Sequence, residues 1–127
     1  MTAIGEAFIA SLYRNLIAGD AYLVVLRGVG VTLLISVCGL FFGTILGAIL
    51  CALRMSKIAP LSLSARIAIG AFRGTPVLLL LMLLFYVLFA RSSAPAELVA
   101  ITGFTLNTGA HIAEIMRGAL GGLDWRQ

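Results

Sequence analysis

The stretch GVGVTLLISVCGLFFGTILGAILCAL runs from Gly28 to Leu53, and it holds no charged residue between Arg27 and Arg54. A helix over these residues would be about 39 Å long at a rise of ~1.5 Å per residue. The hydrocarbon core of a bilayer is about 30 Å thick. The stretch therefore predicts a transmembrane helix, and the rest of the chain is interpreted around it.

The composition agrees with a membrane protein. Of 127 residues, 61% are hydrophobic and 11% are charged, whereas roughly 25% of an average soluble domain is charged. The net charge of +4 does not indicate nucleic-acid binding, because four basic residues cluster between apolar stretches. Cys38 and Cys51 lie inside one apolar stretch, which matches neither a disulfide framework nor a metal site. We expect no bound metal and no cofactor.

Two further apolar stretches follow, so the sequence predicts an all-α membrane protein with three transmembrane helices. GTPVLLLLMLLFYVLFA is short but strongly apolar, and it lies between Arg73 and Arg91. The third stretch is more polar, and it needs protein neighbours to cover Asn107 and His111. The expected segments are an N-terminal interfacial helix over 1–22, a transmembrane domain over 23–127, spans over about 28–53, 74–90 and 96–116, and a loop over 54–73.

The charges predict the orientation. The loop between the first two spans carries Arg54, Lys57, Arg66 and Arg73 and no acid. Loops enriched in Lys and Arg stay on the cytoplasmic side. The N-terminus is then outside, and the third span ends in the cytoplasm.

Small residues recur every fourth position in the first span, at Gly39, Gly43 and Gly47. Such a row lets another helix backbone approach closely. We predict a packing face here, although glycine is also common in membrane helices in general.

The segment FRGTP stands where the basic loop meets the second span. Pro76 breaks the helical hydrogen-bond ladder and disfavours the α conformation at Thr75. Arg73, Gly74, Thr75 and Pro76 thus predict a bend, with Pro60 to Phe72 forming a separate, partly interfacial helix. A plain helix start with an anchoring arginine explains the same residues.

The third span carries polar residues three or four positions apart, which places them on one helix face. One interpretation is a face that lines a translocation path or meets a partner subunit. The other is a hydrogen-bonded seam between helices, with an ion pair between Glu114 and Arg117 at the i,i+3 spacing. The residues of this face are Gly103, Asn107, His111, Glu114 and Gly118, of which Asn107, His111 and Glu114 are the candidates for the path.

Signatures of catalysis are missing. The chain has no G-x-x-x-x-G-K-[ST] phosphate loop, no H-E-x-x-H and no G-x-S-x-G. We therefore expect no catalytic residue, no enzymatic activity and no ATP binding by this chain.

Three stretches together carry a resemblance: GVGVTLLISVCGLFFGTILGAILCALRMS, AFRGTPVLLLLMLLFYV and NTGAHIAEIMRGALGGLDWRQ. In order and spacing they resemble the permease subunits of polar amino-acid ABC importers, of the histidine/glutamine type. The resemblance extends from about Leu26 to the C-terminus. His111 stands where the family commonly has tyrosine, and Arg126 replaces a glycine.

The resemblance implies a transport subunit in the bacterial inner membrane. Its expected partners are a second permease subunit, ATPase subunits that bind ATP, and an extracytoplasmic solute-binding protein. Glu114, Arg117, Gly118 and Gln127 would approach the Glu-Ala-Ala loop that couples to the ATPase, with Gly121 and Gly122 loosening the chain for that turn. Because family members have about five spans, this chain is expected to be an N-terminal portion.

A different function also fits the residues. The glycine row and the polar face are features of a small membrane protein that associates with itself into a helical bundle or pore, without coupling to ATP. An enzyme within the membrane is disfavoured, because the sequence has no paired catalytic groups.

Overall fold

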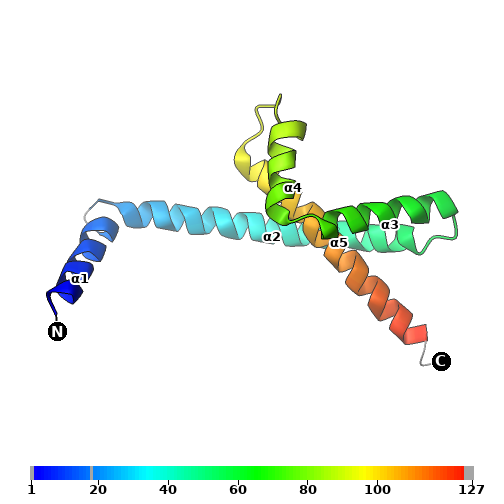
Figure 1. Ribbon diagram of the computed structural model, residues 1–127, viewed down its shortest axis with the longest axis horizontal. Helices are drawn as coiled ribbons and strands as arrows, with labels where there is room; N and C mark the ends of the chain where they lie inside the picture. The colour runs from blue at the N-terminus through cyan, green and yellow to red at the C-terminus, as the bar shows by residue number, and fades with distance from the viewer. Residues whose placement is uncertain (1, 18, 125–127) are drawn as a thin grey trace. The chain divides into compact units, whose positions relative to one another are not determined.

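The computed structural model describes residues 2–17 and 19–124, and within them every regular element is a helix (Figure 1). This confirms the expectation of an all-α chain. The elements are α1 (Ala3–Leu16), α2 (Ala21–Arg54), α3 (Ala59–Gly74), α4 (Val77–Leu83), the π-helix η1 (Leu84–Leu88) and α5 (Ala96–Asp124).

The chain divides into two units, Met1–Leu34 and Ile35–Gln127. The first unit contains α1, which covers most of the segment expected as an interfacial helix. Ile4, Phe8 and Leu12 are exposed along α1. A turn with Asp20 in the left-handed region, at φ 52°, precedes α2, and aspartate is one of the residues that tolerate this conformation. α2 begins at Ala21, so the expected segment 1–22 ends just inside it.

Helix α2 contains the whole of the first predicted span and extends it on the N-terminal side. Among the described residues, it alone is long and apolar enough to cross a membrane as one continuous helix. α3 followed by α4 and η1 would add a second span if the bent pair counts as one. Length and apolarity therefore support one span, or two.

The second predicted span consists of two elements, α4 and η1, and the separate helix α3 precedes it. α3 covers Pro60 to Phe72, as expected, and its axis makes an angle of 108° with the helical segment from Val77 to Leu88. Gly74 is the last residue of α3 rather than the first of the span. Thr75 is extended, with φ −97° and ψ 127°, which is the conformation that a following proline favours.

Helix α5 is longer than the third predicted span, because it continues to Asp124. Gly121 and Gly122 lie inside it as helical residues. The expectation that this glycine pair loosens the chain for a turn is therefore wrong. Glycine lowers helix stability by only about 1 kcal/mol, so two of them do not end a helix by themselves.

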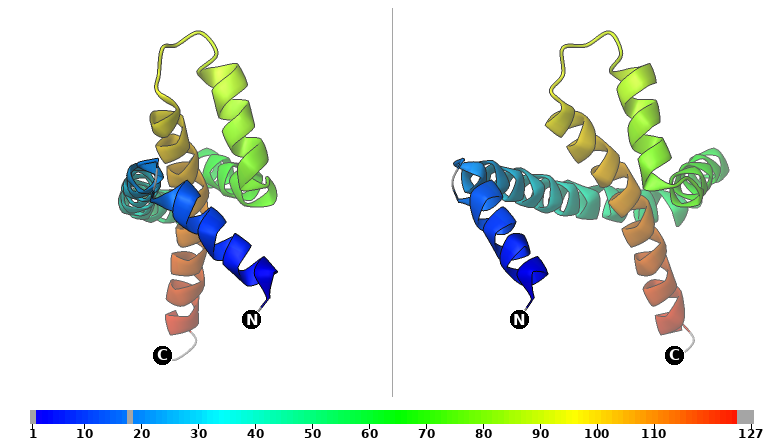
Figure 2. Two further views of the ribbon diagram at one scale, coloured as in Figure 1. Left: turned by 90° about the vertical axis from the view of Figure 1, so that its left-hand side faces the viewer. Right: turned by 60° about the vertical axis from the view of Figure 1, so that its left-hand side comes forward.

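The second unit has two small apolar cores. One joins α2, α3 and α5 through Cys51, Ile69, Ala110 and Ala113, which are at most 2% exposed. The other joins α4, η1 and α5 through Leu80, Leu84 and Val99. Both views in Figure 2 show α4 and the first half of α5 as neighbours joined by a loop. These cores fix the bent segment against α5.

Candidate functional site

The three glycines of the first span lie directly against α5, and we call this contact the glycine seam. A Cβ atom added at Gly39 would lie 3.0 Å from the Cβ atom of Phe104. At Gly43 and Gly47 the corresponding distances, to the Cβ atoms of Thr108 and Ile112, would be 2.9 and 2.8 Å. Real Cβ atoms essentially never lie closer than 3.0 Å to such neighbours, so Gly43 and Gly47 leave no room for a side chain, whereas at Gly39 the side chain of Phe104 would have to shift slightly.

The seam has a counterpart on α5. Gly109 lies against Leu46 of α2, and an added Cβ would be 3.2 Å from the carbonyl oxygen of Gly43. The two backbones thus come close from both sides. The exposed Thr44 directs its hydroxyl to its own helix, donating to the carbonyl of Leu40 at 2.7 Å.

At the C-terminal end of α2, Glu114 of α5 accepts contacts from three arginines, and we call Arg54, Arg73, Arg117 and Glu114 the arginine cluster. Arg117 donates to Oε1 of Glu114 from Nη2 at 2.7 Å and from Nε at 3.0 Å. Arg54 donates to Oε2. Nη1 of Arg73 lies 3.5 Å from the same oxygen.

The sequence predicted one of these three pairs. The i,i+3 spacing indicated Glu114 with Arg117, and the structure confirms that pair. Arg54 and Arg73 were placed in a loop and at a bend, with no partner. A signal was available, because both residues border apolar stretches at the same expected membrane surface as Glu114.

The polar face of α5 does not form one continuous surface. Gly103 is buried under Leu81 and Leu84, whereas an added Cβ at Gly118 would meet no atom within 4 Å. Nδ1 of the exposed His111 donates to the backbone carbonyl of Asn107 at 2.8 Å, which places the proton of a neutral ring on Nδ1. Asn107 is half-buried. Along this face, Gly103 therefore packs against α4 and η1, whereas Glu114 belongs to the arginine cluster.

The residues of the predicted bend are partly tied to α3. The backbone N–H of Thr75 donates to the carbonyl of Ala71 at 3.1 Å, and its hydroxyl donates to the same carbonyl at 2.7 Å. Pro76 supplies no N–H, and its carbonyl accepts from Leu80 to start α4. An added Cβ at Gly74 would meet no atom within 4 Å, so packing does not require glycine there.

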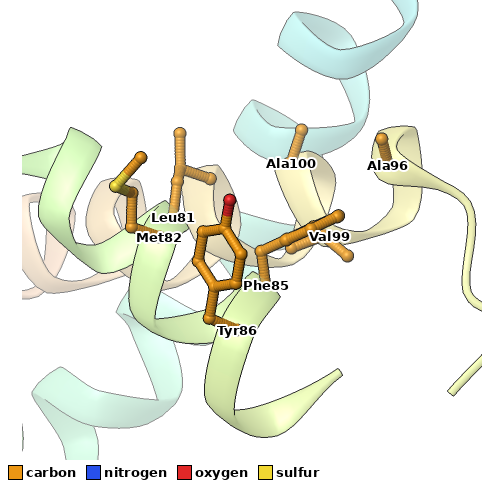
Figure 3. Close-up of a pocket in the computed structure, with 7 residues that line it drawn as sticks. All are labelled: Leu81, Met82, Phe85, Tyr86, Ala96, Val99 and Ala100. Atoms are coloured by element: carbon orange, nitrogen blue, oxygen red, sulfur yellow. The ribbon is translucent and has the colours of Figure 1, made fainter. Parts of the chain in front are cut away.

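A cavity of about 270 Å³ lies between the bent segment and α5. Figure 3 shows its lining side chains, which come from the bent segment on one side and from α5 on the other. The hydroxyl of Tyr86 is the one side-chain oxygen among the labelled residues. The lining is otherwise apolar, and it cannot neutralise the charges of a free amino acid. The lining residues are Leu81, Met82, Phe85, Tyr86, Ala96, Val99 and Ala100.

Residues 2–17 and 19–124 contain no group of His, Cys, Asp and Glu side chains that could hold a metal ion. Cys38 and Cys51 are both free thiols. Gln127, expected near the coupling loop, lies outside the described residues. Two contacts therefore define the candidate site: the glycine seam and the arginine cluster.

Curated relatives cover most of the chain. A probable amino-acid ABC transporter permease protein of Bacillus subtilis is 35% identical over 114 residues, which are 89% of this chain and 50% of the relative. The L-cystine transport system permease protein of the same organism is 35% identical over 95 residues, 73% of this chain and 40% of that protein. The chain is a homologue of amino-acid ABC transporter permeases.

A solved structure agrees with this homology. The crystal structure of an amino acid ABC transporter with histidines matches 76% of the permease homologue and 49% of the solved chain, at a TM-score of 0.64 and 28% identity. No model of a known protein family matches. The permease homologue spans about half the length of the curated relatives it matches.

Proposed function

We propose that this chain forms part of the membrane permease of an ABC importer for polar amino acids. The observation that carries the proposal is the 35% identity over 89% of the chain to an amino-acid ABC permease. The fold supports it, because a solved amino acid ABC transporter matches the helices at a TM-score of 0.64. In this proposal, ATP is hydrolysed by separate cytoplasmic subunits, and a solute-binding protein and a second permease subunit complete the transporter.

The proposal includes three spans with the N-terminus outside. α2 would be the first, α4 with η1 the second and α5 the third, with α3 lying along the cytoplasmic surface. The four basic residues between Arg54 and Arg73 support this orientation. α5 is the most polar of the three, and its contacts with α2, α3 and α4 would shield it from lipid.

Thiol labelling tests this arrangement. With Cys38→Ala as the background, we expect Ser93→Cys to react in intact cells with a maleimide that cannot cross membranes. Lys57→Cys should react only after the cells are permeabilised, because it lies in the basic segment. Both side chains are on exposed or half-exposed connections. The opposite pattern, or reaction of both in intact cells, would contradict three spans with the N-terminus outside.

Transport itself is tested in proteoliposomes. The chain, joined to the sequence that follows it in its gene, is reconstituted with the neighbouring ATPase and solute-binding protein. We expect ATP-dependent uptake of a polar amino acid. Asn107→Ala and His111→Ala should lower uptake roughly tenfold if these residues line the path, and Ser64→Ala on the exposed face of α3 is the matched control. Unchanged uptake would show that neither side chain lines the path.

The self-associating bundle is the weaker candidate. It needs the glycine row on a free surface where another chain can approach. The structure instead packs Gly39, Gly43 and Gly47 against α5 of the same chain. The row is therefore already used within the permease homologue.

A further inference from the structure

Glu114 is shared by arginines from three helices, and its two oxygens divide the contacts. Oε1 faces Nε and Nη2 of Arg117 on its own helix. Oε2 faces Arg54 at the end of α2 and Arg73 in the last turn of α3. Both donors of Arg117 bond to Oε1 alone, which leaves Oε2 to the arginines of the other two helices. One acid thus joins α2, α3 and α5.

The cluster lies at the end of an apolar contact. Ile69 of α3 packs with Cys51 of α2 and with Ala110 and Ala113 of α5. Both alanines are 0% exposed, so their small side chains let α3 come close to α5. Arg54 and Arg73 come one helical turn after Cys51 and Ile69 on their helices, and Glu114 directly follows Ala113. The apolar contact brings the helices together, and the charges meet beside it.

The bend that follows Arg73 has few bonds of its own. Thr75 bonds back to Ala71, and after it Pro76 donates no hydrogen bond. The backbone between Gly74 and Val77 therefore does not fix the direction in which α4 leaves. Because α4 packs on α5 through the core of Leu80, Leu84 and Val99, a contact that also holds the last turn of α3 on α5 constrains the angle between α3 and α4.

We propose that Glu114 is a positioning residue that holds the C-terminal end of α3 and thereby sets the 108° bend into α4. Arg73 transmits the constraint to the bend, and Arg117 orients the carboxylate. Arg54 anchors the carboxylate to α2 from the more buried side, since its side chain is 16% exposed against 44% for Arg73. This role concerns the conformation of the chain and stands whether or not the chain transports amino acids.

The test measures the bend directly in the full chain, in lipid nanodiscs. Nitroxide labels are attached at Leu63→Cys on α3 and Leu83→Cys on α4, both exposed, in a Cys38→Ala background. Pulsed electron paramagnetic resonance gives the distribution of distances between the labels. With Glu114→Gln we expect this distribution to widen roughly twofold, because the bend then samples further orientations.

Matched controls test whether the effect is specific to the arginine cluster or follows from removing any charged side chain. Glu97→Gln removes an exposed acid from the first turn of α5, and Arg66→Gln removes an exposed arginine from α3. Both should leave the distribution unchanged. Arg73→Gln should widen it, though less than Glu114→Gln. If Glu114→Gln does not fold, Arg73→Gln decides, because its half-exposed side chain can be lost without opening the apolar core.

Exchanging the charges of Arg54 and Glu114 provides the strictest test. Arg54→Glu combined with Glu114→Arg restores one ion pair between α2 and α5, but it leaves Arg73 and Arg117 without the shared acceptor. We expect the wide distribution to persist. A narrow distribution in the exchanged chain, or in both Glu114→Gln and Arg73→Gln, would overturn the proposal and assign the bend to the apolar core alone.

Discussion

Two of the contacts between α5 and α2 use opposite chemistry. In the glycine seam, α2 presents Gly39, Gly43 and Gly47, which carry no side chain, and an added Cβ at Gly47 would lie 2.8 Å from the Cβ atom of Ile112. In the arginine cluster, the long side chain of Arg54 reaches across to Glu114. The first contact depends on the absence of atoms and the second on long charged groups.

The difference reflects what each contact can gain from its surroundings. In a lipid environment, burying an apolar side chain gains little, because lipid is equally apolar. Association then depends on close backbone approach, which glycine permits. Charged groups are tolerated only near the membrane surface or when paired. The seam therefore suits the middle of α2, and the cluster suits its end.

Breaking the seam should have the largest effect. Gly47→Val places a branched side chain where Ile112 and the carbonyl of Gly109 already lie. We expect the free energy of unfolding to fall by about 3 kcal/mol, since overfilled contacts cost this much. The measurement is a titration with sodium dodecyl sulfate, followed by energy transfer between dyes at Ile45→Cys and Ile115→Cys, both exposed, in a Cys38→Ala background.

The control for this variant lies on the same helix. Gly30→Val introduces the same side chain at a glycine where an added Cβ would meet no atom within 4 Å. Its effect should stay within about 0.5 kcal/mol, as for other exposed sites. Equal losses at both glycines would show that valine harms the helix itself and that the seam has no special role.

The same comparison explains how far the sequence could predict the structure. The spacing of Gly39, Gly43 and Gly47 indicated a packing face because it repeats with the helical period. It could not indicate the partner, because α5 meets this face only after the chain has turned three times, after α2, at the bend between α3 and α4, and after η1. The pair of Glu114 with Arg117 was predictable because both residues lie on one helix. The contacts from Arg54 and Arg73 depend on tertiary packing, which spacing along the chain does not encode.

Helix boundaries also include some that the sequence predicts and some that it does not. Pro76 correctly indicated the bend, because proline alters local geometry wherever it occurs. Gly121 and Gly122 were misinterpreted, because glycine only permits a turn and does not impose one. The many exposed apolar side chains of α2, among them Leu33, Val37 and Phe41, were predicted from composition. Their exposure is what a lipid-facing surface would show.

The smallest expected effect is that of salt, which should weaken the arginine cluster and leave the glycine seam unchanged. Arg73 and Arg117 are 44% and 45% exposed, so ions can screen their pairs with Glu114. Raising KCl from about 0.1 to about 1 M shortens the screening length from ~10 to ~3 Å. We expect the unfolding free energy to fall by less than about 1 kcal/mol, measured by heating in an uncharged detergent with the same dye pair.

Glu114→Gln should lose this salt dependence, while Gly47→Val keeps it, because the seam contains no charge. An equal response in the native chain and Glu114→Gln would mean that the cluster adds nothing that salt can weaken, and that the uncharged contacts hold α5 to α2.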